Sequence, residues 1–296
     1  MQRRILLIDG TGLIFRAYYS IQSGMTAPDG RPVNAVYGLT RMLMKAFRDV
    51  PSTAGAVVFD AGKKTFRNEM FPAYKAQRPS PPDDLCVQFD LCRETVEATQ
   101  VPVLVEPGFE ADDIIATLAR QAQEAGHAVT ILTSDRDILQ LLSPYCELLM
   151  PAGRGEFNTQ TLETFDEKYG FPIDRFVDFK AIMGDPSDNI PGVKGIGEKG
   201  AAKLVSTHGK LEKIYANIDL VKPDGVQKKL RGAKDEVFMF RDLVTLKSDV
   251  PVEYDFSGRT LPHFGGEEFQ DLLGQFGFGG IRKDAAAAGD LMVDTL

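Results

Sequence analysis

Acidic residues stand at the ends of several apolar runs in this chain. Of all residues in the sequence, these are the ones whose types and spacing most clearly predict a reactive site. Four runs end in this way, namely Ile5–Asp9, Ala56–Asp60, Val101–Glu110 and Val129–Asp135. A glycine-rich segment, MGDPSDNIPGVKGIG, adds Asp185 and Asp188. Short apolar runs bounded by Gly or Asp indicate buried parallel strands. Because ligands bind at the carboxyl ends of such strands, we expect the acids to converge on one edge of a sheet.

Nine carboxylates make up this candidate acidic set, and like charges at such density need cations to remain ionised. The set consists of Asp9, Asp60, Glu110, Asp112, Asp113, Asp135, Asp137, Asp185 and Asp188. Ligation by oxygen alone suits Mg²⁺ or Mn²⁺, and carboxylates that hold two such ions are suited to phosphodiester cleavage. Any single member alone is better explained as a helix-capping or turn residue, whereas the whole set favours a metal site.

Two basic segments accompany the acids, although the chain carries a net charge of −8. Residues 63–78 contain five bases and one acid, and residues 194–234 contain ten bases and four acids. Each alone is explained as a solvated helix face, but together they favour phosphate binding. In the first segment we expect Arg67, Lys75 and Arg78 to stabilise a scissile phosphate, and Tyr74 and Phe66 to stack on an unpaired base. The alternative for that segment is a mobile basic loop.

A glycine-rich hairpin, IPGVKGIGEKGAAKL, is the third motif. Its glycines allow a tight turn between helices and close approach of the backbone to a ligand. The N–H groups that open the next helix can hold a phosphate, as in the helix-hairpin-helix of DNA-binding proteins. A plain glycine-rich connector is the alternative. The candidate DNA-binding residues here are Gly192, Lys194, Gly195, Gly197, Lys199 and Lys203.

The patterning predicts an α/β domain followed by a helical region. Strands and helices alternate as β-α-β-α-β-α-β up to a boundary near Tyr169–Pro172, beyond which strand signals thin out. We expect Lys63–Pro82 to be a long surface excursion and Asp284–Leu296 to be a tail or linker. The predicted helices are Leu13–Ile21, Ala35–Arg48, Leu85–Thr99, Glu110–Glu124, one that begins with RDILQLL, Asp174–Met183, Glu198–His208 and Phe238–Leu246.

Composition limits the compartment and the class of protein. Of 296 residues, 43% are hydrophobic and 26% are charged, which is typical of a globular protein. No apolar run approaches the roughly 18 residues of a membrane span, so we expect no membrane association. The three cysteines have no metal-binding spacing, which favours a reducing, cytoplasmic compartment.

Six motifs, in this order, resemble the bacterial 5′–3′ exonuclease or flap endonuclease family, which includes the N-terminal nuclease domain of DNA polymerase I. They are LIDGTGLIFRAYY, FDAGKKTFRNEMFPAYKAQRP, GFEADDIIATLA, TSDRDILQLL, GDPSDNIPGVKGIGEKGAAKL and FRDLVTLKSDVPV. The resemblance implies a PIN-like, Rossmann-like parallel sheet with helices on both faces and a helix-three-turn-helix DNA-binding region. The implied division is a nuclease core over 1–172 with a helical arch at about 63–84, a DNA-binding region over 173–260, and a C-terminal extension or linker over 261–296.

The resemblance also implies roles for the acidic residues. One divalent ion would be bound by Asp60, Glu110 and Asp112, with Asp9 nearby. A second would be served by Asp135, Asp137 and Asp188, and the extra acids of the bacterial members are matched by Asp113 and Asp185. The ions would be two or more Mg²⁺ or Mn²⁺.

The basic residues receive roles in the same way. Phosphate would be contacted by Arg16 and Arg67, and the scissile phosphate would be oriented by Lys75 and Arg78. The hairpin Gly192–Gly200 would bind duplex DNA with a K⁺ ion on its carbonyl groups. The implied enzyme cuts branched or 5′-flap DNA by a two-metal mechanism. We expect it to act as a monomer at the bacterial nucleoid, in RNA primer or flap removal during replication and repair.

Three other functions are weighed against this one. A phosphatase of the haloacid dehalogenase type needs a second Asp two residues after the first, but Thr11 follows Asp9 at that distance. A PIN-type ribonuclease would share the sheet and the acids without needing the hairpin. A protein that binds branched DNA without cutting it would not need the complete acidic set. The sequence leaves open whether this is a free-standing nuclease or part of a polymerase, and the linker-like end slightly favours the latter.

Overall fold

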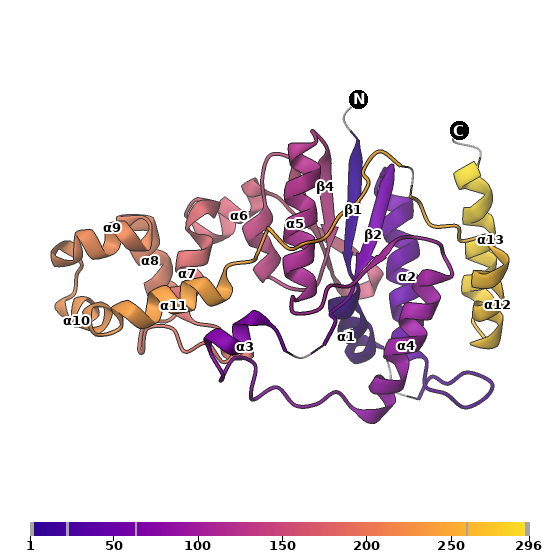
Figure 1. The fold of residues 1–296 in the computed structure, drawn as a ribbon, viewed down its shortest axis with the longest axis horizontal. Helices are drawn as coiled ribbons and strands as arrows, with labels where there is room; N and C mark the ends of the chain where they lie inside the picture. Colours follow the sequence, from indigo (N-terminus) through magenta and orange to yellow (C-terminus); the bar gives the residue numbers. More distant parts are fainter. Residues whose placement is uncertain (1–2, 22–23, 63, 259, 294–296) are drawn as a thin grey trace.

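A six-stranded sheet forms the centre of the protein, which a computed structural model describes over residues 3–21, 24–62, 64–258 and 260–293 (Figure 1). The strands are β1 (Arg4–Asp9), β2 (Ala54–Val58), β3 (Val103–Leu104), β4 (Ala128–Leu132), β5 (Cys146–Pro151) and β6 (Phe157–Gln160). Their order is β3-β2-β1-β4-β5-β6, and all neighbours pair in parallel except β5 with β6. The predicted α/β class is confirmed, and the carboxyl ends of β2, β1 and β4 lie next to one another.

Both faces of the sheet are covered by helices. Alternate residues of β1 belong to different buried clusters, with Ile5 and Leu7 on one face and Leu6 and Ile8 on the other. The helix packed on the first face is α5 (Ala111–Glu124). The other face is covered by α1 (Gly10–Ser20), α2 (Asn34–Asp49) and α4 (Asp83–Glu97). Burial on both sides explains why β2 is free of polar side chains and why β1 is apolar from Ile5 to Ile8.

A group of helices continues the first buried cluster beyond the sheet, at one end of the molecule (Figure 1). It contains α6 (Leu162–Tyr169), α7 (Phe176–Met183), α8 (Glu198–His208), α9 (Leu211–Ala216), α10 (Asp224–Gly232) and α11 (Lys234–Val244). Phe165 stacks on Tyr169 at a centroid distance of 4.5 Å, and Phe176 and Phe179 surround them. The predicted helix over 198–208 has these bounds, whereas the one predicted to begin at Phe238 begins four residues earlier at Lys234.

The segment predicted as a helical arch is mostly not helical. It contains the short helix α3 (Phe66–Met70), followed by turns and extended chain up to α4. Its prolines remove hydrogen-bond donors and disfavour helical geometry in the residues before them, which explains the difference. We call residues 71–82 the strap. Lys63, at the start of the predicted excursion, lies outside the described residues.

Two shorter expectations also need correction. The run Val101–Glu110 forms only the two-residue strand β3 at the sheet edge, because Pro102 and Pro107 lack the N–H groups that a longer ladder needs. The helix predicted from RDILQLL is a 3-10 helix over Asp137–Leu141.

The C-terminal part forms a helical pair, α12 (Glu267–Gln275) and α13 (Gly279–Val293), that packs against α2 (Figure 1). This differs from the predicted extension or linker. Phe264, Phe269 and Leu273 are buried in the same cluster as Leu39 and Leu43 of α2. The alanine-rich composition of α13 did not reveal this contact. Small residues are common in linkers, but they also allow a helix to pack closely against its neighbour. Along the described chain, no helix combines the length and the apolar character needed to cross a membrane.

We predict that Phe269→Ala destabilises the whole protein. Phe269 is 0% exposed, so its truncation should lower the free energy of unfolding by about 3–5 kcal/mol, measured by urea denaturation. Glu268→Ala, at the exposed neighbouring position, is the control and should change it by less than about 0.5 kcal/mol. Equal stability of the two variants would mean that the helical pair does not contribute to the core.

Candidate active site

Asp9 ends β1 and also caps α1, so it lies where the sheet meets a helix N-terminus. One carboxylate oxygen accepts a hydrogen bond from the Gly12 N–H (2.8 Å) and the other accepts one from the Thr133 hydroxyl (2.8 Å). A Cβ atom on Gly12 would lie 2.1 Å from the Asp9 carboxylate, so a glycine is required there. Thr133 was not predicted from the sequence, although it stands directly after β4 and two residues before Asp135.

Four aspartates form the floor of the site, and we call Asp9, Asp60, Asp112 and Asp135 the floor aspartates. Burial raises the pKa of Asp9 to about 7, and the negative charges of Asp60 and Asp135 add to that rise. Burial also raises the pKa of Asp112 well above its usual range, and the charges of Asp135, Asp9 and Asp60 contribute in turn. The structure therefore brings together acids from the ends of β1, β2 and β4 and from the start of α5.

Glu110 and Asp188 form a second group with basic side chains of the strap. Lys75 Nζ lies 2.7 Å from a Glu110 oxygen, and Arg78 binds Asp188 at 2.5 Å. The Tyr74 hydroxyl lies 3.0 Å from an oxygen of each of these two carboxylates. Lys75 has a φ of 54°, in the left-handed region, and its N–H donates to the Asp188 carbonyl. The strap is thus bound to the segment that precedes the hairpin.

Lys180 of α7 links two more acids and was missed by the sequence analysis. Its ammonium group contacts Asp137 (2.7 Å) and forms an ion pair with Asp185. Burial raises the pKa of Asp137 to about 6, even though the positive charge of Lys180 opposes this. The signal available in the sequence was the spacing in KAIMGD, because a lysine in the last turn of a helix can reach an acid just beyond it.

Arg67 and Asp113 form a buried ion pair with each other. Two guanidinium nitrogens of Arg67 lie 2.7 and 2.8 Å from the two Asp113 oxygens. Arg67 is 1% exposed, and it also donates to the carbonyls of Leu243 and Thr245. The Lys247 N–H donates to Asp113 as well. The phosphate contact predicted for Arg67 and the metal ligation predicted for Asp113 are therefore not supported in this arrangement.

The stacking predicted for Tyr74 also needs correction, whereas that for Phe66 stays a prediction. Tyr74 is 4% exposed and its hydroxyl is held between two carboxylates, so its ring is not available to stack on a base. Phe66 is half-buried, with its ring centroid 6.2 Å from that of Phe109 and the Lys247 ammonium 5.4 Å away. Arg16 is exposed on α1 and remains able to reach a ligand.

The hairpin between α7 and α8 is built by glycines. Gly192 and Gly195 have φ values of 64° and 78°, and Gly197 caps α8 with open space around it. Lys194, Lys199 and Lys203 are all exposed on this hairpin and the helix that follows. The structure therefore brings the six candidate DNA-binding residues together in one hairpin-helix unit.

Lys229 of α10 was counted only as part of a basic window, yet it lies directly on the hairpin. Its ammonium group donates to the Gly195 carbonyl at 2.9 Å. A Cβ atom on Gly195 would lie 2.6 Å from that nitrogen, so the absence of a side chain at Gly195 leaves room for the contact. The sequence did not indicate this contact between Lys229 and Gly195, because 34 positions separate the two residues.

The floor aspartates fit a divalent cation by their chemistry. In the described part of the chain, no three His, Cys, Asp or Glu side chains form a ready-made metal shell, and Lys75, Arg78 and Lys180 lie against several of the acids. Burial and the charges of neighbouring floor aspartates, however, raise the pKa of Asp9 and of Asp112, and a cation among them would relieve the repulsion. Their oxygen ligands suit a hard ion such as Mg²⁺ or Mn²⁺.

Acids at the carboxyl edge of a parallel sheet, beside a basic strap and a helical hairpin, are the arrangement of a nucleic-acid-cleaving enzyme. Residues 4–170 match the family described as 5′–3′ exonuclease, N-terminal resolvase-like domain, and residues 171–264 match its C-terminal SAM fold. The chain therefore belongs to the 5′–3′ exonuclease family.

Relatives among known proteins support this membership. The chain is 41% identical over 281 residues to the thermostable DNA polymerase I of Thermus thermophilus, covering 93% of this chain and 33% of that protein. It is 43% identical over 250 residues to DNA polymerase I of Mycobacterium bovis, covering 84% and 28%. The chain thus spans about a third of the length of these relatives.

Two solved structures share the fold. The flap endonuclease of bacteriophage T5, in a complex with DNA and metal ions, matches with a TM-score of 0.68 and 21% identity, covering 97% of this chain and 100% of that one. The catalytic core of Rad2 in complex with a DNA substrate matches with a TM-score of 0.61 and 15% identity, covering 96% and 90%.

We predict that Asp113→Asn destabilises the protein, because it leaves the Arg67 guanidinium buried beside a neutral side chain. The free energy of unfolding should fall by about 3–5 kcal/mol in urea denaturation. The double variant Arg67→Met/Asp113→Leu removes both charges and should be more stable than Asp113→Asn. If the free energies of unfolding lost by Arg67→Met and by Asp113→Asn alone simply add up in the double variant, the two side chains do not act as a pair, which would contradict the prediction.

The hairpin offers a matched pair of glycine variants. A Cβ atom on Gly192 would lie 2.4 Å from the Gly184 nitrogen, so Gly192→Ala should lower the free energy of unfolding by about 1–3 kcal/mol. At Gly197 a Cβ atom meets nothing within 4 Å, and Gly197→Ala should change it by less than about 0.5 kcal/mol. Thermal melting of the two variants checks this, and equal melting temperatures would show that the hairpin tolerates a shift at Gly192.

Proposed function

We propose that the protein is a structure-specific 5′ nuclease that hydrolyses DNA phosphodiesters as a 5′–3′ exonuclease and as a 5′-flap endonuclease. The observation that carries the proposal is the mutual repulsion of the floor aspartates at the carboxyl edge of the sheet, beside basic side chains of the strap. Its substrate would be branched or flapped DNA with duplex arms. Its task would be RNA primer or flap removal in replication and repair, at the bacterial nucleoid.

Two or more Mg²⁺ or Mn²⁺ ions would be held by the acids. The first would lie among Asp9, Asp60 and Asp112 with Glu110, and the second among Asp135, Asp137 and Asp188. Such ions supply the Lewis acidity that lowers the pKa of an attacking water and offsets the charge of the phosphate. Asp185 would act through Lys180, which it shares with Asp137.

The strap residues would bind and orient the scissile phosphate. Lys75 and Arg78 each donate to a carboxylate in the structure. A phosphate oxygen could accept hydrogen bonds from the same groups in place of the carboxylate. Tyr74 would keep Glu110 and Asp188 at a fixed separation, since its hydroxyl lies 3.0 Å from both. Arg16, exposed on α1, would contact a neighbouring phosphate. The positive charges of these side chains would stabilise the extra negative charge that the phosphate carries in the transition state of hydrolysis.

The hairpin would hold the duplex arm through its backbone N–H groups and lysines, without reading the bases. A K⁺ ion on the hairpin carbonyls is part of the proposal. Lys229 already donates to one of these carbonyls, that of Gly195, so the ion would share the hairpin with an ammonium group. We also propose that the enzyme acts as a monomer, and that a polymerase domain belongs to the same full-length chain, since the relatives are about three times as long.

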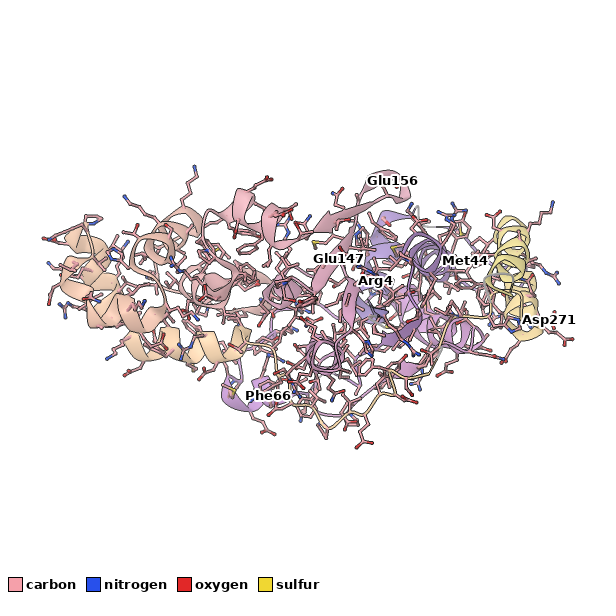
Figure 2. All side chains as sticks on the ribbon, turned by 90° about the horizontal axis from the view of Figure 1, so that it is seen from above. Arg4, Met44, Phe66, Glu147, Glu156 and Asp271 are labelled. Atoms are coloured by element: carbon pink, nitrogen blue, oxygen red, sulfur yellow. The ribbon has the colours of Figure 1, made fainter. Side chains whose placement is uncertain are left out.

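The proposal predicts metal-dependent cutting that Asp135→Asn abolishes. An end-labelled 5′-flap duplex should be cut near the junction with Mg²⁺ and remain intact with EDTA. Because the variant loses one charge of the metal site, its cleavage rate should fall by at least about a hundredfold. Binding of the flap in EDTA should persist. Asp271→Asn, exposed at the far end of the molecule on α12, is the matched control and should cut normally (Figure 2).

One outcome would overturn the function itself. Wild-type protein that binds the flap tightly but fails to cut it with either Mg²⁺ or Mn²⁺ would be a branched-DNA-binding protein. Normal cutting by Asp135→Asn would instead leave the nuclease function intact and show that the metal ligands are assigned wrongly.

A further inference from the structure

Tyr19 is the most exposed large hydrophobic side chain in the described part of the chain, at 70%. It lies near the end of α1, the helix that begins in the active site directly after Asp9. Ten residues of helix place it about 15 Å from Asp9 along the helix axis. A single exposed tyrosine is common on protein surfaces, so its surroundings decide whether it has a role.

The backbone around Tyr19 is held rigidly by buried amide side chains. The Tyr18 carbonyl accepts a hydrogen bond from Asn34 of α2 (3.2 Å), and Asn34 accepts one from Gln88 of α4 (2.9 Å). Both amides are buried, at 2% and 0% exposure. The Tyr18 hydroxyl also donates to Asp84 in the first turn of α4 (2.7 Å). An exposed aromatic ring on such a support is preorganised, so little entropy is lost when it binds a ligand.

Tyr18 and Tyr19 form an aromatic pair, with ring centroids 5.0 Å apart and an angle of 81° between the rings. Tyr18 thus supports Tyr19 from one side and leaves its other surfaces open to solvent. Arg16 stands three residues before Tyr19, so both project from neighbouring positions on the same side of α1. A cation beside an exposed aromatic ring is the combination that binds a phosphate and the adjacent base of a single strand.

The strap connects this surface to the active site. Within the strap, Arg78 donates to the Ser187 carbonyl, next to the hairpin, and just beyond its end Asp84 accepts a hydrogen bond from the Tyr18 hydroxyl. In Figure 1 the strap passes beneath α1, while the hairpin helices lie at the opposite end of the strap. A duplex arm held at the hairpin would therefore lead its unpaired end past the strap residues and toward α1.

We propose that Tyr19, supported by Tyr18, stacks on a base of the unpaired strand after that strand has passed the active site. The proposal rests on the proposed nuclease function and adds a binding surface for single-stranded DNA that lies outside the acidic site. Stacking of this kind tolerates any base, because every base has a π-face. At about 3.4 Å per stacked nucleotide, a distance of about 15 Å corresponds to a contact roughly four to five nucleotides into the flap.

The test crosses protein variants with DNA that lacks single bases. Fluorescence anisotropy in EDTA would measure binding of a 5′-flap duplex, intact or with one abasic nucleotide at each of flap positions one to six. Tyr19→Ala should bind the intact flap about tenfold more weakly than the wild type. On the flap that is abasic at the contact position, wild type and Tyr19→Ala should bind equally, because the partner of the ring is already missing.

Two control variants separate stacking from other effects. Tyr19→Phe keeps the ring and should bind as the wild type does. Tyr145→Ala removes another exposed tyrosine, 58% exposed and located before β5 at the other end of the sheet, and should have no effect. Unchanged thermal melting of Tyr19→Ala would exclude a folding defect.

Two results would overturn the proposal. One is unchanged binding of the intact flap by Tyr19→Ala. The other is an equal loss on every abasic flap and on a duplex without a flap, which would assign Tyr19 to the duplex arm or to the fold. Cleavage of the intact flap by the wild type with Mg²⁺ is scored separately. Failure there rejects the nuclease function, while the binding measurements still decide the role of Tyr19.

Discussion

Repulsion among the floor aspartates is the constraint on which the rest of the structure depends. Parallel strands bring Asp9, Asp60 and Asp135 to one edge, and Asp112 joins them from the first turn of α5. The fold offsets part of this charge with helix N-termini. Asp9 accepts a hydrogen bond from the start of α1, and Asp60 accepts one from the Ala111 N–H at the start of α5. Each contact sets a carboxylate against the positive end of a helix dipole, which lowers the free energy of holding the acids together.

Basic residues near the site fall into two groups with different purposes. Arg67 is buried, and it joins α3, α5 and the end of α11 through Asp113 and the Leu243 carbonyl. Removing one member of such a pair is strongly destabilising, so this contact fixes α3, which precedes the strap, against α5 and α11. Lys75 and Arg78, in contrast, are partly exposed. Lys75 contacts Glu110 and, at 3.8 Å, Asp188, and Arg78 contacts Asp188. They retain the freedom to bind a substrate because the fold does not depend on them in the same way.

The sequence predicted the strand-end acids and the hairpin because local patterns determine both. An apolar run followed by Asp marks a strand end, and glycine spacing marks a tight turn. It did not separate Asp112 from Asp113, although adjacent helix positions point about 100° apart and only one of them can face the floor. It also did not predict the burial of Arg67, or the packing of Phe269 against α2. These features depend on contacts between residues far apart in the chain, about which local periodicity carries no information.

The strap explains how selectivity for branched DNA would arise from ordinary contacts. Its proline-rich chain combines turns with extended stretches. Arg78 within it contacts the segment next to the hairpin, and Asp84 just after it contacts Tyr18 near the C-terminal end of α1. The hairpin that we propose binds duplex DNA and the helix that we propose binds an unpaired strand would thereby be held at a fixed separation. A plain duplex would satisfy the first surface and a single strand the second, whereas a flapped substrate would engage both in one molecule. Such simultaneous engagement raises the effective affinity by orders of magnitude without any base-specific contact. The separation of the two surfaces, rather than the sequence of the DNA, would then determine where the phosphodiester is presented to the acids.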